Sequence, residues 1–326
     1  MYIKKLFFIF ICIFFLFSCK ENRKNFYFRE IGTMLWISNE HKDSVVKMIV
    51  KETLENSSVI VAQIPWSPKD TTYFNNISWY KQLAENHGKT FMLNVDWQEN
   101  NRHDTRGGWK FGNAKVRDQF KIDITRVVDF YKPDYLTLGV EVNYYALTNP
   151  DDYKYFIQTF NELKTIFSKK NTKLKVGLSF QLELLYGHHI DWKQIRTLEP
   201  LNAIVENLDY LGISTYPDSN SSYNKDFDNS VNYLDSIKSL YSLPIGISET
   251  GLITEKYNDD QRIKYIQIIY TKFNKLDLKF LIWGSIIDNP TKFSWENTIG
   301  LIDSQGKPKK EFQTWKLEYS NLKTNL

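Results

Sequence analysis

Short apolar runs alternate with longer segments of helical periodicity from Glu30 onward, and this alternation constrains the fold more than any other feature. Regular succession of strand and helix is typical of parallel strands joined by crossover helices. The expected strands are Ile31–Ile37, Ser58–Ile64, Phe91–Asp96, Tyr135–Val142, Leu174–Gln181, Tyr210–Thr215, Ile245–Glu249 and Phe280–Ile286. Helices are expected near 40–55, 75–87, 114–131, 151–169, 190–206, 227–241, 258–275 and 309–322. Eight such units predict an α/β protein with a single-domain (β/α)8 TIM barrel over residues 30–326.

The main alternative is a doubly wound open sheet, which usually carries a glycine-rich phosphate loop after its first strand. In this chain the corresponding turn reads Trp36-Ile37-Ser38-Asn39 and contains no glycine. No internal repeat or Pro/Gly-rich linker follows residue 30, so a single barrel is the simpler prediction.

Composition narrows the class of protein. Hydrophobic residues make up 42% and charged residues 25% of the 326 residues, which is enough apolar material for a full core. The 42 Lys and Arg nearly balance the 38 Asp and Glu, so binding of nucleic acid by a broad basic face is disfavoured. The aromatic residues (9 Trp, 20 Tyr and 22 Phe) would suit sugar rings where they line a groove.

The amino terminus has the layout of a secretory leader. A basic pair precedes the apolar run Leu6–Phe17, which is shorter than the about 20 residues that a membrane-spanning helix needs. Leu16, Ser18 and Cys19 resemble the lipobox of bacterial lipoproteins. The resemblance implies a signal peptide over residues 1–18, lipidation of Cys19, a tether over 19–29, and an exported protein anchored to a membrane. An ordinary leader that is cleaved nearby is the alternative.

The active site of a (β/α)8 barrel lies at the carboxyl ends of its strands, so polar residues at those ends are the candidates. Two of them stand out, because Glu141 and Glu249 end apolar runs on strands that lie on opposite sides of the barrel mouth. Such acids can also cap a helix or hold an arginine. The further candidates at strand ends are Asp96, Asn143, Glu183, Tyr216, Asp218, Trp283 and Asp288.

Paired carboxylates that flank one bond are what glycoside hydrolysis needs. One carboxyl protonates the leaving oxygen, and the other attacks the anomeric carbon or activates water. We therefore favour hydrolysis of a glycosidic bond.

The segments YLTLGVEVN, YLGISTYP, LPIGISETG and FLIWGSIID resemble clan A of the glycoside hydrolases, which are retaining enzymes on a (β/α)8 barrel. The resemblance implies that Glu141 is the acid/base and Glu249 the nucleophile. It also implies that Tyr216 hydrogen-bonds the nucleophile and that Trp283 forms the floor under the sugar. Within the clan, the chain is most similar to the endo-β-1,4-galactanases of family 53, followed by β-mannanases, which implies endo-action on a plant or microbial polysaccharide.

The chain departs from the clan at one position. Clan members commonly carry Asn before the acid/base, where it contacts the sugar 2-hydroxyl, and this chain has Val140. Asn94, Asn143 or Gln63 are the expected replacement donors. The other expected substrate contacts are Trp36, Trp66, Asp96 and Trp97, together with the long loop 97–112 that contains Arg102, Arg106 and Trp109.

No cofactor or metal is expected, since the five histidines form no recognisable metal-ligand set and no serine-hydrolase or phosphate-loop motif occurs. His188 and His189 are expected on the surface. The expected partners are an oligo- or polysaccharide and a membrane, with the protein itself a monomer. A non-catalytic surface lipoprotein that binds glycans in the same cleft remains the alternative.

Overall fold

The computed structural model describes residues 30–68, 70, 72–170, 173–192, 196–219, 227–289 and 298–324. Cys19 and the predicted leader and tether lie outside the described residues. The strands are β1 (Glu30–Thr33), β2 (Val59–Pro65), β3 (Thr90–Asp96), β4 (Tyr135–Thr137), β5 (Lys175–Gln181), β6 (Tyr210–Thr215), β7 (Ile245–Thr250) and β8 (Phe280–Trp283). The helices are α2 (Asp43–Asn56), α3 (Tyr73–Asn86), α4 (Ala114–Tyr131), α5 (Val142–Thr148), α6 (Pro150–Lys170), α7 (Leu182–Leu185), α8 (Glu199–Asn202), α9 (Asp228–Leu240), α10 (Asp259–Leu276) and α11 (Lys310–Thr324).

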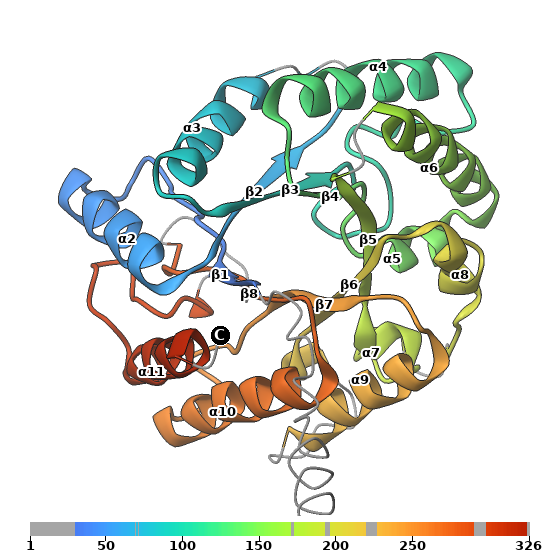
Figure 1. Cartoon of the computed structure of the whole chain (residues 1–326). Coiled ribbons are helices and arrows are strands. Elements are labelled where there is room, and N and C mark those ends of the chain that lie inside the picture. The colour runs from blue at the N-terminus through green and yellow to red at the C-terminus, as the bar shows by residue number, and fades with distance from the viewer. Residues whose placement is uncertain are drawn as a thin grey trace, which may run out of the picture.

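The eight strands form one parallel sheet in the order β1-β8-β7-β6-β5-β4-β3-β2. An isolated parallel bridge between Met34 and Val61 joins β1 to β2 and brings the two edges of the sheet together. The longer helices surround this sheet on the outside (Figure 1). The predicted single-domain (β/α)8 barrel is therefore confirmed.

Several predicted elements differ from the structure. The predicted strands Ile31–Ile37 and Phe280–Ile286 are too long, because β1 ends at Thr33 and β8 ends at Trp283. The predicted strand 135–142 is too long, because β4 ends at Thr137 and α5 begins at Val142. The predicted helix 190–206 is wrong: α8 covers Glu199–Asn202, and a short 3-10 helix covers Val205–Asn207. Pro200 explains the difference at 190–206, since proline is tolerated in the first turn of a helix but breaks a helix interior.

The core has two layers. Inside the barrel, a small cluster packs at the end where the strands begin, and it consists of Met34, Val59, Val61, Met92, Tyr210, Phe280 and Ile282. A larger cluster lies between the sheet and the helices and includes fully buried aromatic rings such as Trp315 and Phe120. The alternation along each strand separates the two layers, because successive side chains point to opposite faces.

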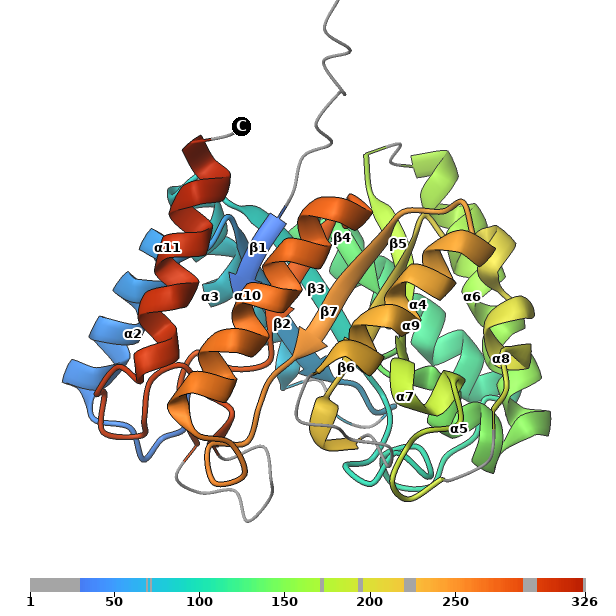
Figure 2. The same cartoon turned by 90° about the horizontal axis from the view of Figure 1, so that it is seen from below.

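The two ends of the barrel differ in what they carry. The strands run from the end at which Glu30 begins β1 toward the end that carries α5 and α7 (Figure 2).

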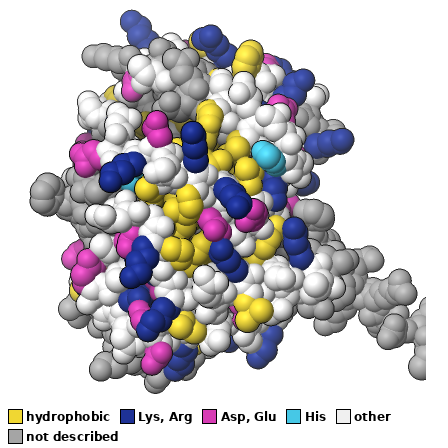
Figure 3. Space-filling model, turned by 90° about the vertical axis from the view of Figure 1, so that its left-hand side faces the viewer, with side chains coloured by type: hydrophobic (Ala, Val, Ile, Leu, Met, Phe, Trp, Pro, Cys, Tyr) yellow, Lys and Arg dark blue, Asp and Glu magenta, His cyan; other side chains and the backbone are white. Residues whose placement is uncertain are grey.

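On the face that includes α2, Lys and Arg side chains are interspersed with acidic and hydrophobic ones (Figure 3). Among the described residues, none of the helices is long and apolar enough to cross a membrane.

Candidate active site

A pocket of about 620 Å³ lies at the carboxyl ends of the strands. Both predicted catalytic residues, Glu141 and Glu249, line it. The other described lining residues are Asn100, Asn101, Arg102, His103, Tyr144, Gln181, His189, Ile190, Asp191, Trp192, Tyr216, Asp218, Ile253 and Lys256. The pocket therefore occupies the place where barrel enzymes carry their active sites.

Glu141 is held at the start of α5. Its backbone is left-handed, with φ 52° and ψ 45°, a conformation that is uncommon for a residue other than glycine. Ser214 donates a hydrogen bond from Oγ to Glu141 Oε1 at 2.6 Å, and Arg102 Nε lies 3.2 Å from Glu141 Oε2. Unusual backbone of this kind clusters at functional sites.

Glu249 reaches the pocket because β7 contains a bulge. Ile213 of β6 pairs with Ile247, but Ser214 pairs with Glu249, so Ser248 is an extra residue. Ser248 points into the barrel, where its Oγ lies 2.8 Å from the Oγ of Ser179 on β5, a strand that does not neighbour β7. Strict alternation would turn Glu249 outward, and the bulge turns it into the pocket instead.

The end of β6 and the residue that follows it supply one hydroxyl group to each carboxylate. Ser214 donates to Glu141, and Tyr216 donates from its phenol oxygen to Glu249 Oε1 at 2.5 Å. Ser214 lies on β6, and Tyr216 directly follows the last residue of β6, Thr215, so the two donors are neighbours but one in the chain. Both carboxylates are largely buried, so these hydrogen bonds offset part of the cost of removing them from water.

Arg102 connects Glu141 to Asp96. Its Nη1 lies 2.7 Å from Asp96 Oδ1, while Arg106 Nη2 lies 3.3 Å from Asp96 Oδ2. Burial by itself lowers the pKa of Arg102. The carboxylates of Asp96, Glu141 and Glu249 raise it by a larger amount, so the pKa of Arg102 lies above its ordinary value. Arg102 is therefore a permanent cation between two acids.

The carboxylates of Asp96 and Glu183 are bound by polar side chains of the protein itself. Asp96 is held by the two arginines, and Gln63 donates to it from Nε2 at 3.3 Å. Glu183 is completely buried and accepts hydrogen bonds from Gln181 Nε2 at 2.5 Å and Thr215 Oγ1 at 2.6 Å. Neither residue belongs to the described pocket lining.

The expected amide donors near Glu141 do not line the described part of the pocket. Asn143 exchanges hydrogen bonds with the backbone of Gln181, both at 2.9 Å, and thereby fastens α5 to β5. Asn94 is buried on β3 inside the barrel. The structure therefore does not place these expected donors in the described lining of the pocket.

The predicted tryptophan contacts are also placed differently. Trp66 and Trp97 are fully buried and donate from Nε1 to Asp123 Oδ2 at 3.1 Å and to the Leu138 carbonyl at 3.0 Å. Trp283 donates to the Ile299 carbonyl at 2.7 Å and packs in the outer core, so it does not form a pocket floor. Its position follows from alternation on β8, which turns Ile282 inward and Trp283 outward. Trp36 is half-buried against the inner cluster.

Among the lining residues that were not predicted as site residues, three are aromatic and lie outside loop 97–112. Tyr144 lies three residues after Glu141, and three residues along a helix is the spacing at which two side chains share a face. His189, expected on the surface, is buried and accepts a hydrogen bond at Nδ1 from the Asp191 backbone at 3.2 Å. Trp192 falls where a helix was expected. The aromatic side chains of His189 and Trp192 were the sequence signal that could have identified this segment as part of the site.

Loop 97–112 contributes to the pocket through Asn100, Asn101, Arg102 and His103. Its tryptophans turn inward, since Trp109 packs edge-on against Trp66 at 4.9 Å between ring centroids. The predicted role of this loop as a wall of the pocket therefore rests on its polar residues.

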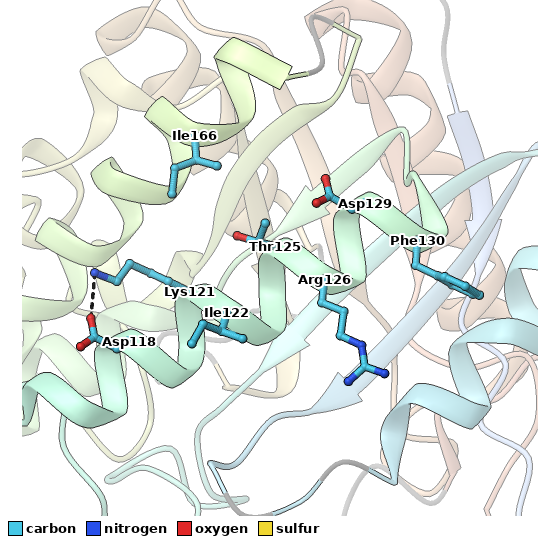
Figure 4. Close-up of a pocket in the computed structure, with 8 residues that line it drawn as sticks. All are labelled: Asp118, Lys121, Ile122, Thr125, Arg126, Asp129, Phe130 and Ile166. Carbon is cyan, nitrogen blue, oxygen red and sulfur yellow. Dashed lines mark ion pairs between the residues drawn. The ribbon is translucent and has the colours of Figure 1, made fainter.

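A second cavity, of about 980 Å³, lies on the outer surface of α4 beside Ile166 of α6 (Figure 4). Its apolar part consists of Ile122, Phe130 and Ile166, and an ion pair between Lys121 and Asp118 lies at one end. It lacks a pair of facing glutamates. Within the described parts of the chain, no group of three or more His, Cys, Asp or Glu residues is placed to hold a metal ion.

The chain matches no protein-family model, and no curated protein matches it. Solved structures do match. An exo-β-1,4-mannosidase from Opitutaceae bacterium strain TAV5 is 13% identical with a TM-score of 0.68, and a family 39 glycoside hydrolase from Bacteroides cellulosilyticus WH2 is 15% identical with a TM-score of 0.65. The matches cover 92% and 91% of this chain but only 62% and 64% of those chains, which is less than two thirds of their length.

A β-glucosidase from Thermotoga maritima is 13% identical with a TM-score of 0.59, and the match covers 92% of this chain and 98% of that one. At these identities the likeness concerns the fold. This chain has the same (β/α)8 barrel fold as these glycoside hydrolases.

Proposed function

We propose that the protein is a retaining β-glycoside hydrolase, with Glu141 as the acid/base and Glu249 as the nucleophile. One observation carries the proposal: two largely buried glutamates, one at the start of α5 and one on β7, line one pocket, and each accepts a hydroxyl hydrogen bond from the end of β6 or the residue after it. Structural acids such as Asp96 and Glu183 are instead held outside the described lining. The fold shared with glycoside hydrolases supports the same chemistry.

The reaction proceeds in two displacements. Glu249 attacks the anomeric carbon while Glu141 donates its proton to the glycosidic oxygen, so the bond to the leaving sugar breaks and a covalent glycosyl-enzyme forms. Glu141, now a carboxylate, removes a proton from water, which attacks the same carbon and releases Glu249. Tyr216 holds the orientation of Glu249, and Ser214 holds that of Glu141.

We infer a neutral oligo- or polysaccharide as the substrate. The described lining carries Arg102 and Lys256 as well as Asp191 and Asp218, so neither sign of charge dominates apart from the two glutamates. The expectation from the sequence is endo-action on a plant or microbial polysaccharide, in the manner of family 53 galactanases. The β-1,4-mannosidase and β-glucosidase among the structural matches place β-mannan and β-glucan on the same test panel.

The proposal includes export and a lipid anchor at Cys19. Glu30 begins β1 at the end of the barrel opposite the pocket, so a tether over residues 19–29 would join the barrel on the side away from the site (Figure 2). An anchored barrel of this kind could keep its pocket open to soluble glycans.

A polysaccharide panel tests the function. The full chain is incubated with β-galactan, β-mannan, xylan and β-glucan, and new reducing ends are measured. We expect one substrate to be cleaved with retention of the anomeric configuration, and Glu249→Gln to abolish turnover while binding persists. Glu141→Gln should spare a glycosyl fluoride far better than the glycan, because fluoride needs no protonation to leave.

Near-native activity in both glutamine variants, or inversion of the product anomer, would refute the assignment. The competing function is glycan binding without turnover, which the valine at position 140 favours because clan members commonly carry asparagine there. Tight binding of a panel glycan with no new reducing ends would establish that second function.

A further inference from the structure

One wall of the pocket is built beside Glu141 from two separate segments. Tyr144 comes from α5, and His189 and Trp192 come from the segment that follows α7. Tyr144 and His189 are more than nine-tenths buried, while Trp192 is half-buried. We call these three residues the aromatic wall.

Hydrogen bonding sets the direction of the Tyr144 hydroxyl. The Asp191 backbone N–H donates to His189 Nδ1 at 3.2 Å, so in neutral histidine the ring proton lies on Nε2. Burial lowers the pKa of His189, which keeps the ring neutral near pH 7. Nε2 then donates to the Tyr144 hydroxyl oxygen over 2.6 Å. The hydroxyl proton of Tyr144 is left to be donated elsewhere, and among the described residues it meets no second acceptor.

Trp192 is placed by aromatic contacts on two sides. Its ring lies edge-on to His103 at 5.4 Å between centroids and to Tyr144 at 6.4 Å. His103 belongs to the loop after β3, so these contacts tie that loop to the segment after α7 above Glu141. A half-buried indole fixed in this way offers a rigid apolar face at little cost in conformational entropy.

Two amide side chains on this side of the pocket are engaged by the protein itself. Gln181 donates from Nε2 to Glu183 and accepts at Oε1 from the Leu184 backbone at 2.6 Å. Asn143 is bonded to the Gln181 backbone. Among the described residues, the Tyr144 hydroxyl is therefore a donor on this side of the pocket that the protein's own contacts leave available.

We propose that the aromatic wall binds the leaving-group sugar of the substrate, with Trp192 stacking on the sugar ring and Tyr144 donating a hydrogen bond to a sugar hydroxyl. This inference rests on the proposed function, since an acid must stand beside the oxygen that it protonates, and the leaving sugar carries that oxygen. The wall flanks the acid, Glu141, and Tyr216 and Ile253 line the pocket with Glu249.

Binding is tested first, without turnover. In a Glu249→Gln background, the Kd values of cellotetraose, mannotetraose, β-1,4-galactotetraose and xylotetraose are measured by calorimetry. For the tetrasaccharide that binds, Trp192→Ala should raise Kd about tenfold and Tyr144→Phe about fivefold. Trp192→Phe, which keeps an aromatic face, should recover most of the loss. The matched controls Trp79→Ala and Tyr155→Phe, which change exposed aromatics on α3 and α6, should leave Kd unchanged.

Turnover then tests the leaving-group assignment. With Glu249 intact, Trp192→Ala should lower kcat/KM for the tetrasaccharide about tenfold but alter it less than about twofold for the matching glycosyl fluoride, which has no leaving sugar. Equal losses on both substrates would overturn the assignment.

The wall and the proposed function can fail separately. Absence of binding by all four tetrasaccharides, or Kd values that do not respond to Trp192→Ala and Tyr144→Phe, would overturn the wall as a sugar site. Binding that depends on Trp192 with no turnover of any panel substrate would uphold the wall as a glycan surface and refute the hydrolase.

Discussion

Arg102 Nε lies 3.2 Å from Oε2 of Glu141, and both residues have left-handed backbone, with φ 64° for Arg102 and φ 52° for Glu141. Neither is glycine, so each conformation has an energetic cost that the surrounding contacts must offset. The guanidinium also reaches Asp96 at 2.7 Å, and so it anchors loop 97–112 to the end of β3 while contacting the proposed acid/base. A cation at this distance favours the ionised form of a carboxylate.

Removal of Arg102 should change the pH dependence of catalysis. In Arg102→Met, the loss of the cation should move the basic limb of kcat/KM upward by about one pH unit, because the proposed acid keeps its proton to higher pH. The kcat/KM at the optimum should fall, since loop 97–112 loses its anchor. Arg106→Met is the matched control, because Arg106 contacts Asp96, whereas the ion pair with Glu141 in the described part of the chain is made by Arg102. An unchanged limb in Arg102→Met, or an equal shift in both variants, would contradict this role.

Trp283 should act on stability rather than on substrate binding. Trp283→Ala removes a buried ring that packs against Trp315 and Tyr265, so the free energy of unfolding should fall by about 3–5 kcal/mol. Urea unfolding measures this loss, and assays at low temperature should show nearly parental KM in the folded protein. An unchanged unfolding free energy combined with a large rise in KM would instead place Trp283 against the substrate.

Asp288 should make stability decline with rising pH. Burial raises its pKa to about 6, although Lys309 Nζ at 2.8 Å acts in the opposite direction. Between about pH 4 and 6 the folded protein holds a proton that the unfolded chain has lost, so this group's contribution to stability decreases as pH rises through that window. The free energy of unfolding of the parent minus that of Asp288→Asn should therefore be about 2 kcal/mol larger at pH 4 than at pH 7.

Urea unfolding at four pH values between 4 and 7 measures the Asp288 effect. The exposed Asp118→Asn serves as the control and should show little such dependence. A difference between parent and Asp288→Asn that stays constant with pH, or grows toward pH 7, would show that Asp288 does not titrate in this way.

Lipidation is tested at Cys19. Cys19→Ala should move the protein from the detergent phase to the aqueous phase, or leave an uncleaved precursor, because the acylated sulfur is lost. Cys12→Ala changes the other cysteine, which lies inside the predicted leader, and should partition like the parent. Parental protein that is wholly aqueous, with a mature start other than Cys19, would remove the lipoprotein assignment.

The barrel could be predicted because its information is local. Apolar runs such as Ile245–Ile247 are short and bounded by turns, and the helical segments between them repeat at regular intervals. Most helices fall within a few residues of their predicted ranges, as α4 does at Ala114–Tyr131. The helix expected over 190–206 failed because Pro200 interrupts it, a signal that was present in the sequence but was outweighed by periodicity.

The sequence by itself determined the strand order, the end of the barrel that carries the site, and the candidate pair of glutamates. Tertiary structure decided which side chains enter the pocket. Alternation along β7 would turn Glu249 outward, and only the extra residue at Ser248, defined by pairing with β6, turns it inward. Arg102 and Tyr144 likewise meet the site through contacts between segments that are distant in sequence. Such contacts depend on packing and register between segments, which the pattern within any one segment does not contain.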